Sequence, residues 1–192
     1  MAIVRHFVSS AILTFVMLSS GAAQEPQAPV PAQYSANAIG QSGTVAGKSF
    51  GLNVYIDAVS PEGQVDELIE ILRQKGQDGL VSALEKSKDV GRIAPVGSVG
   101  TTMRVVLINP RPDGGQHIVL ATNRPIAFGE LYNGTRSRDY PIGILVLNVD
   151  GNGKGTGTFA PLCKVKFNKK KELVVEHYGQ KPFRVVNVTR QK

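Results

Sequence analysis

Alternating apolar positions dominate the second half of the chain. Between Ile142 and Val149 both faces of the alternation are apolar, which is typical of a strand covered on both sides. A glycine-rich and then lysine-rich strand runs on to Phe167, and Leu173–Tyr178 and Phe183–Val188 complete the series. The connecting turns, 150–153, 168–171 and 179–182, are rich in Asp, Asn, Gly and Lys. Such short turns predict an antiparallel meander within one sheet.

Glycines stand at every second position from Gly151 to Gly157. Since successive side chains of a strand point to opposite faces, one face of this strand is bare. A bare stripe permits a bulge, a tight bend or the close approach of another group. We interpret it as a curved corner of the sheet in preference to a ligand groove.

The first half of the chain predicts further strands and a pair of helices. Alternation from Phe50 to Ala58 indicates a half-buried strand, and Thr101–Ile108 and Gln116–Thr122 indicate a hairpin. Apolar residues at helical spacing predict helices near 61–75 and 79–88, with Gly76 ending the first. The predicted fold is mainly β (α+β): an antiparallel meander folded as a sandwich or open barrel, with a two-helix insertion after the first strand.

The amino terminus has the three parts of a secretory signal. A weakly cationic start precedes the apolar core Ala11–Leu18, and the small residues Gly21-Ala22-Ala23 follow. We predict a signal peptide over 1–23 with cleavage after Ala23, and the apolar core is too short to span a bilayer. Residues 24–46, rich in Gln, Ala and Pro, predict a flexible lead-in to a single domain over 47–192. The expected location is the periplasm or the outside of a bacterial cell.

Charge and cysteine content narrow the function classes. The 192-residue chain carries a formal charge of +7, which favours anionic partners. Lys164, Lys166 and Lys169–Lys171 form the densest cluster, but they lack the interleaved aromatic side chains of single-strand nucleic-acid platforms. We therefore interpret the cluster as a solubilising hairpin tip and disfavour nucleic acid as a partner. The single cysteine, Cys163, leaves the fold dependent on its apolar core.

The stretch from Arg124 to Pro141 is the least periodic and the richest in functional groups. Loops on a rigid sheet commonly carry binding residues, and guanidinium groups bind carboxylates and phosphates in two-pronged fashion. The predicted binding residues are Arg124, Glu130, Tyr132, Arg136, Arg138, Asp139 and Tyr140. The alternative is structural, because the arginines can instead pair with Glu130 and Asp139 and pin the loop.

Catalytic, metal and cofactor chemistry finds little support in the residue pattern. Cys163 with His117 or His177 would make a nucleophile and base, but the cysteine lies in an apolar stretch where burial is the rule. The histidines lack zinc-ligand spacing. The Asp150-Gly151-Asn152 turn fails as a calcium loop because Lys154 takes a ligand position. We assign no catalytic residue, no metal and no cofactor.

Three short segments resemble a family of uncharacterised secreted bacterial proteins. They are Leu120–Ile126, Arg136–Pro141 and the Gly153-Lys154-Gly155 turn, within a similarity that covers roughly 50–188. The resemblance implies export and a shared fold. It implies no chemistry, because the family has no assigned activity.

Three functional hypotheses follow. The favoured one is a non-enzymatic exported envelope protein that binds an anionic group or protein partner through the arginine-rich loop. The first alternative is an exported hydrolase or transferase that uses Cys163 or the carboxylates of Glu130 and Asp139. The second alternative is a β-barrel carrier of an apolar ligand. The oligomeric state is left open by the sequence.

Overall fold

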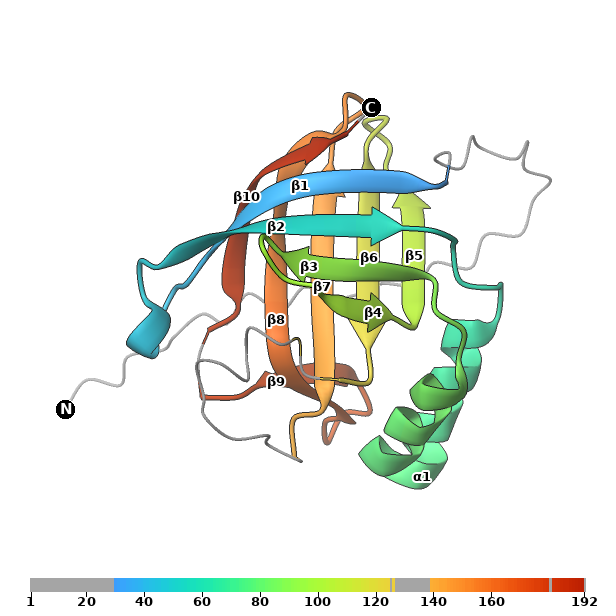
Figure 1. Cartoon of the computed structure of the whole chain (residues 1–192). Helices are drawn as coiled ribbons and strands as arrows, with labels where there is room; N and C mark the ends of the chain where they lie inside the picture. Colours follow the sequence, from blue (N-terminus) through green and yellow to red (C-terminus); the bar gives the residue numbers. More distant parts are fainter. Residues whose placement is uncertain (1–29, 125, 127–138, 180, 192) are drawn as a thin grey trace.

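The computed structural model of the chain describes residues 30–124, 126, 139–179 and 181–191. A ten-stranded sheet runs in the order β4-β3-β2-β1-β10-β8-β7-β6-β5, with β9 attached to β8 beside this path. All the pairings are antiparallel, and the sheet curls into a nearly closed barrel with one helix on its outside (Figure 1). The predicted signal peptide and its cleavage after Ala23 lie outside the described residues.

The strands are β1 (Ala32–Ile39), β2 (Ser49–Ile56), β3 (Gly91–Pro95), β4 (Thr101–Met103), β5 (Val105–Pro110), β6 (Gln116–Thr122), β7 (Ile142–Val149), β8 (Lys154–Phe167), β9 (Leu173–His177) and β10 (Phe183–Arg190). The helices are η1 (Gly43–Val45), a single 3-10 turn, and α1 (Gln64–Lys86). The mainly β antiparallel fold is therefore confirmed, and of the two predicted architectures the structure has the barrel-like one.

The barrel closes where β4 gives way to β5. The sequence predicts one strand over Thr101–Ile108, but the structure breaks it at Arg104. Before the break the chain pairs with β3, and after it the backbone N–H of Arg104 donates to the carbonyl of Ala121 in β6 (2.8 Å). The Arg104 guanidinium holds this corner by donating to the Ser87 carbonyl (2.8 Å) and pairing with Asp89. One strand thus becomes two because it bends to join both ends of the sheet.

Large apolar side chains fill the barrel interior. Tyr34, Leu52, Leu145 and Phe159 are at most 1% exposed, and each comes from a different strand. Phe159 and Phe183 stack with their ring centroids 5.9 Å apart. Burial of one such side chain contributes about 1.5–3 kcal/mol, so this shared interior is the main source of stability.

The two-helix insertion predicted near 61–75 and 79–88 is wrong as stated, because a single helix, α1, occupies the region. The helix bends sharply at Gly76, whose φ of 66° and ψ of −163° suit glycine alone. The prediction that Gly76 ends the first helix is wrong, because the helix bends there and continues to Lys86. Leu68, Leu72, Leu80 and Leu84, from both sides of the bend, pack on the outside of the barrel against residues of β5, β7 and β8.

The flexible lead-in predicted over 24–46 is contradicted from Ala32 onward, because Ala32–Ile39 forms β1. This strand pairs with β2 on one side and β10 on the other, so it is central to the barrel. Tyr34, Ala36 and Ala38 point inward and are almost fully buried. The composition of the segment suggested a linker, whereas its alternation of alanines with polar residues is that of a half-buried strand. The domain therefore begins before residue 47.

Strand β8 forks the sheet. One of its edges pairs with β7 along most of its length, and the other edge is shared by β10, at Lys154–Phe159, and β9, at Cys163–Phe167. The meander is wrong at this point, since β10 joins β8 and not β9. The bare glycine face brings backbones together: a Cβ on Gly155 would stand 1.9 Å from the Asn148 carbonyl oxygen. Asn187, opposite, has a φ of 53° at a bulge in β10, which agrees with a curved corner.

Candidate binding surface

The two described ends of the predicted binding loop lie at the same end of the barrel. Thr122 of β6 pairs with Gly143 of β7, so the chain leaves and re-enters the sheet at adjacent positions. Arg124 and Asp139 are exposed, and Tyr140 is partly buried. The other predicted residues, Glu130, Tyr132, Arg136 and Arg138, lie outside the described residues.

Ile126 anchors the start of the loop. Its side chain is fully buried, and its N–H donates to the Pro161 carbonyl (3.2 Å). Gly143 makes room for it, because a Cβ there would come within 2.8 Å of the Ile126 side chain. Thr122 and Asn123, just before, are buried, and their side-chain oxygens have no hydrogen-bond partner among the described residues.

Tyr140 fixes the other end of the loop to β9. Its hydroxyl donates to Glu176 Oε1 (2.5 Å), and its ring meets Tyr178 edge to face with centroids 5.1 Å apart. Glu176 also pairs with Lys166 of β8. The hydrogen bond to Glu176 raises the pKa of Tyr140, and the hydrogen bond from Lys166 lowers the pKa of Glu176. With these two pKa shifts, the Tyr140 phenol keeps its proton and the Glu176 carboxylate stays ionised at neutral pH.

Gln77, next to the bend of α1, connects the helix to the same place. Its side-chain Nε2 donates to the Asp139 carbonyl (2.9 Å), and its Oε1 accepts from the Val165 backbone N–H (3.1 Å). On the β7 side of β8 the pairing ends at Cys163, so this N–H lies beyond the last residue of β8 that β7 reaches. No sequence motif marks Gln77, and the adjacent Gly76 is the only local sign that the helix changes direction there.

The hairpin of β8 and β9 is strongly basic. We use the name hairpin surface for the six lysines of residues 164–181: Lys164, Lys166, Lys169, Lys170, Lys171 and Lys181. Residues 164–181 contain these lysines against two glutamates, so they hold a net +4 of the chain's +7. Both glutamates are engaged, Glu176 as described above and Glu172 by Asn168 Nδ2 (2.8 Å).

Hydrogen bonds to the Asn168 side chain define the turn at the tip of the hairpin. Asn168 Oδ1 accepts from the backbone N–H groups of Lys170 (2.8 Å) and Glu172 (2.9 Å). Lys171 takes a φ of 62°, a conformation that suits glycine and disfavours lysine. Among the described residues, the side chains of Lys169, Lys170 and Lys171 are exposed and make no ion pair.

Cys163 and His177 come together but do not form a nucleophile and base. They are partners in the register of β8 and β9. Cys163 is fully buried, its thiol donates to the Ile142 carbonyl (3.2 Å), and burial raises its pKa to about 12. Burial lowers the pKa of His177, so both groups are neutral at pH 7. His117 is elsewhere, on β6, within hydrogen-bond distance of Asn148 Oδ1 (2.8 Å).

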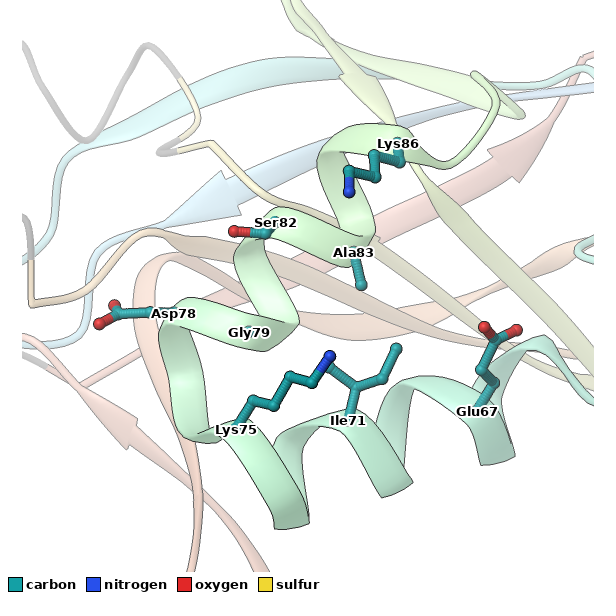
Figure 2. Close-up of a pocket in the computed structure, with 8 residues that line it drawn as sticks. All are labelled: Glu67, Ile71, Lys75, Asp78, Gly79, Ser82, Ala83 and Lys86. Carbon is teal, nitrogen blue, oxygen red and sulfur yellow. The ribbon is translucent and has the colours of Figure 1, made fainter.

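A cleft of about 470 Å³ lies between the two halves of α1 (Figure 2). Ile71 and Lys75 on one half face Gly79 and Ala83 on the other. None of its lining residues is fully buried, and acidic and basic side chains both point to solvent. It lacks the enclosed apolar wall and converging polar groups of a ligand pocket.

The described part of the chain holds neither a candidate metal cluster nor a helix that could cross a membrane. We find no group of three or more His, Cys, Asp or Glu side chains there that could hold a metal ion. No helix in the same residues has the length and apolar character needed to cross a bilayer.

Comparison with known proteins adds no relative to this picture. No protein family, curated protein or solved structure matches the chain. The resemblance to secreted bacterial proteins therefore stays a prediction.

Proposed function

We propose that this chain is a non-enzymatic exported protein that binds an anionic group or an acidic protein partner. Binding would use the arginine-rich segment 124–140 together with the hairpin surface beside it. The observation that carries the proposal is the concentration of lysines on the hairpin that holds Tyr140, where the segment returns to the barrel. Among the described residues, Lys169, Lys170 and Lys171 of this hairpin make no ion pair. The hairpin was interpreted from sequence as a solubilising tip, and its contact with Tyr140 is the reason to include it.

Electrostatics favours an anionic ligand at this surface. Glu172 and Glu176 offset only two of the six positive charges of residues 164–181, so the hairpin keeps a net charge of +4. Positive groups within one Debye length, about 8 Å at physiological salt, act together on an approaching anion. Such clusters raise both the association rate and the affinity of anions, and the effect falls as salt rises.

The competing enzyme class has weaker support. A catalytic cysteine needs an accessible thiolate, whereas the Cys163 thiol is buried and its pKa is raised to about 12. The packed interior, with Tyr34 and Phe159 buried at its centre, also gives little support to carriage of an apolar ligand. Surface binding is the function that the described geometry supports best.

The test compares two triple variants with the same loss of charge. In the first, Lys169, Lys170 and Lys171 are replaced by Gln, and in the control the exposed Lys75, Lys86 and Lys88 are replaced by Gln. Binding to poly-L-glutamate and to inorganic polyphosphate is measured by titration at about 0.02 M and about 0.2 M salt. We expect the hairpin variant to bind about tenfold or more weakly and the control to bind like the wild type.

A second variant addresses the arginine-rich segment itself. Arg136→Ala with Arg138→Ala should weaken binding of the same two polyanions if the segment contributes. Equal binding by the two lysine variants would show that only net charge matters and would remove the proposal. Absence of salt-sensitive binding in the wild type would remove it as well.

A further inference from the structure

Among the described residues, strand β9 pairs along one edge only, with β8, and we call its other edge the free edge. Backbone hydrogen bonds from Asn168 N–H to the Glu172 carbonyl (2.9 Å) and from Tyr178 N–H to the Leu162 carbonyl (3.4 Å) fix the register with β8. Even-numbered residues of β9 therefore direct their N–H and C=O groups to β8. By the same alternation Leu173, Val175 and His177 direct theirs away from it.

The fork in the sheet leaves that edge open. β10, the next strand in sequence, pairs with the other half of β8, from Lys154 to Phe159. Figure 1 shows β9 beside the lower part of β8, apart from β10. Within the described ranges, we find no backbone hydrogen bond to the outward groups of Leu173, Val175 or His177. A row of such groups is a template for a further strand.

The apolar side chains of β9 at this edge are exposed to solvent as well. Leu173 and Val175 are 45% and 42% exposed, and they share a face with Val165 and Phe167, which pack against α1. The apolar surface under the helix thus continues outward without cover. His177, on the same face, has a buried Nδ1 with no hydrogen-bond partner among the described residues.

Charge indicates what would cover the edge. Lys169–Lys171 precede β9, Lys181 follows it, and Lys164 lies in the neighbouring strand. A second copy of the chain would bring the same positive charge to this edge, whereas an acidic segment would be attracted to it. Lysines near an edge disfavour pairing with other strands in general. Charge attraction would offset that effect for an acidic strand.

We propose that the free edge of β9 accepts an extended acidic segment of another protein as an additional strand. The inference rests on the proposed function and specifies its partner. Backbone groups of Leu173, Val175 and His177 supply the hydrogen bonds, and apolar residues at alternate positions of the partner cover Leu173 and Val175. Acidic residues on the partner's other face or at its ends meet the lysines of the hairpin surface.

The probe is a short synthetic peptide of alternating glutamate and valine. Its matched control is the same peptide with an N-methyl group on every backbone amide, which keeps the charge and blocks strand pairing at both edges of the peptide. Binding is measured by titration, and exchange of the backbone amides of full-length protein by NMR. We expect the parent peptide to slow exchange at Leu173, Val175 and His177 by about tenfold or more and the methylated peptide to leave it unchanged.

Val175→Pro provides the protein-side test. It removes one outward N–H without breaking a bond to β8, and proline is tolerated at such edge positions. Val175→Thr keeps the N–H and nearly the same shape, and it serves as the control. We expect the proline variant to lose peptide binding and the threonine variant to keep most of it. Slow thiol labelling of Cys163 in both variants verifies that the barrel stays folded.

The outcomes separate the inference from the function on which it rests. Equal binding of the parent and methylated peptides, or unchanged binding by Val175→Pro, overturns strand addition and leaves anion binding standing. Failure of both peptides and both polyanions to bind at low salt overturns the two together. Protection of the same amides that rises with protein concentration, without peptide, identifies a second copy as the occupant and also overturns the inference.

Discussion

The thiol of Cys163 offers the sharpest check on the proposal that this protein binds a partner and is not a cysteine enzyme. Burial raises its pKa from 9.0 to about 12. At pH 8 an ordinary thiol of pKa 9.0 is about one-tenth thiolate, whereas a thiol of pKa about 12 is ionised in about one molecule in ten thousand. Ionisation alone therefore slows reaction with a disulfide reagent about a thousandfold, and full burial of the side chain slows it further.

The assay follows labelling of native protein at pH 8, with and without denaturant. We expect labelling in buffer at the rate of transient unfolding and rapid labelling in denaturant. Fast labelling of the native state, with a pH midpoint below 9, would refute the reasoning and revive the cysteine-enzyme hypothesis. Such a result would mean that the thiolate of Cys163 is both accessible and stabilised.

The same raised pKa has a consequence for stability. Above pH 9 the thiol of the unfolded chain ionises while that of the folded chain does not, so the unfolded state is favoured increasingly up to about pH 12. Three pH units correspond to about 4 kcal/mol at most. Other groups also titrate in this range, so the measurement is the difference between wild type and Cys163→Ala in chemical denaturation. The wild type should lose more stability than the variant between pH 9 and pH 11.

Two further predictions concern the backbone. Gly155→Ala should destabilise the protein by about 3 kcal/mol or more, because the added Cβ would stand 1.9 Å from the Asn148 carbonyl oxygen. Gly151→Ala is the control: its Cβ would stand 3.4 Å from its nearest neighbour, so stability should change by less than about 1 kcal/mol. Equal denaturation midpoints for the two variants would contradict the packing at the curved corner. Lys171→Gly should stabilise the hairpin by about 1 kcal/mol, because it relieves a φ of 62°, and Lys170→Gly, at a position without positive φ, should destabilise it slightly. Thermal melting checks this pair, and a loss of stability in Lys171→Gly would show that the turn does not have this conformation.

Much of the barrel could be predicted because its walls follow simple alternation. The strands β2, β6 and β7 fall where apolar and polar residues alternate or where both faces are apolar. The turns could also be predicted from their residue types. For example, Asp150 Oδ1 accepts from the N–H groups of Asn152 and Lys154, each at 2.9 Å. Local signals of this kind are sufficient because the interactions that they report are local.

The partners of the strands could not be predicted in the same way. The turn before Phe183 indicated pairing of β10 with β9, yet β10 pairs with the glycine-rich half of β8 and with β1. This pairing of β10 accompanies closure of the barrel around Tyr34 and Phe159, two core residues that are far apart in sequence. β1 itself was missed because alanines give a weak hydrophobic signal, although Ala36 and Ala38 are buried.

The candidate site was predictable in part. The sequence singled out Tyr140 and Asp139, and the structure places both beside β9 and α1. It did not single out Glu176 or Gln77, whose roles come from contacts 36 and 62 residues away in the chain. Polar residues of this kind look like solvated surface until the fold brings their partners to them.

The fork at β8 separates the wall of the barrel from β9, the strand that we propose as the binding element. Ten strands form the sheet, yet β9 is a side branch, and the wall passes from β10 to β8 without it. Lengthening, shortening or recharging the 168–171 turn would change the reach and selectivity of the branch while the enclosed interior stays intact. Substitutions in this branch can therefore change its surface, by evolution or by design, without changing the interactions that stabilise the barrel.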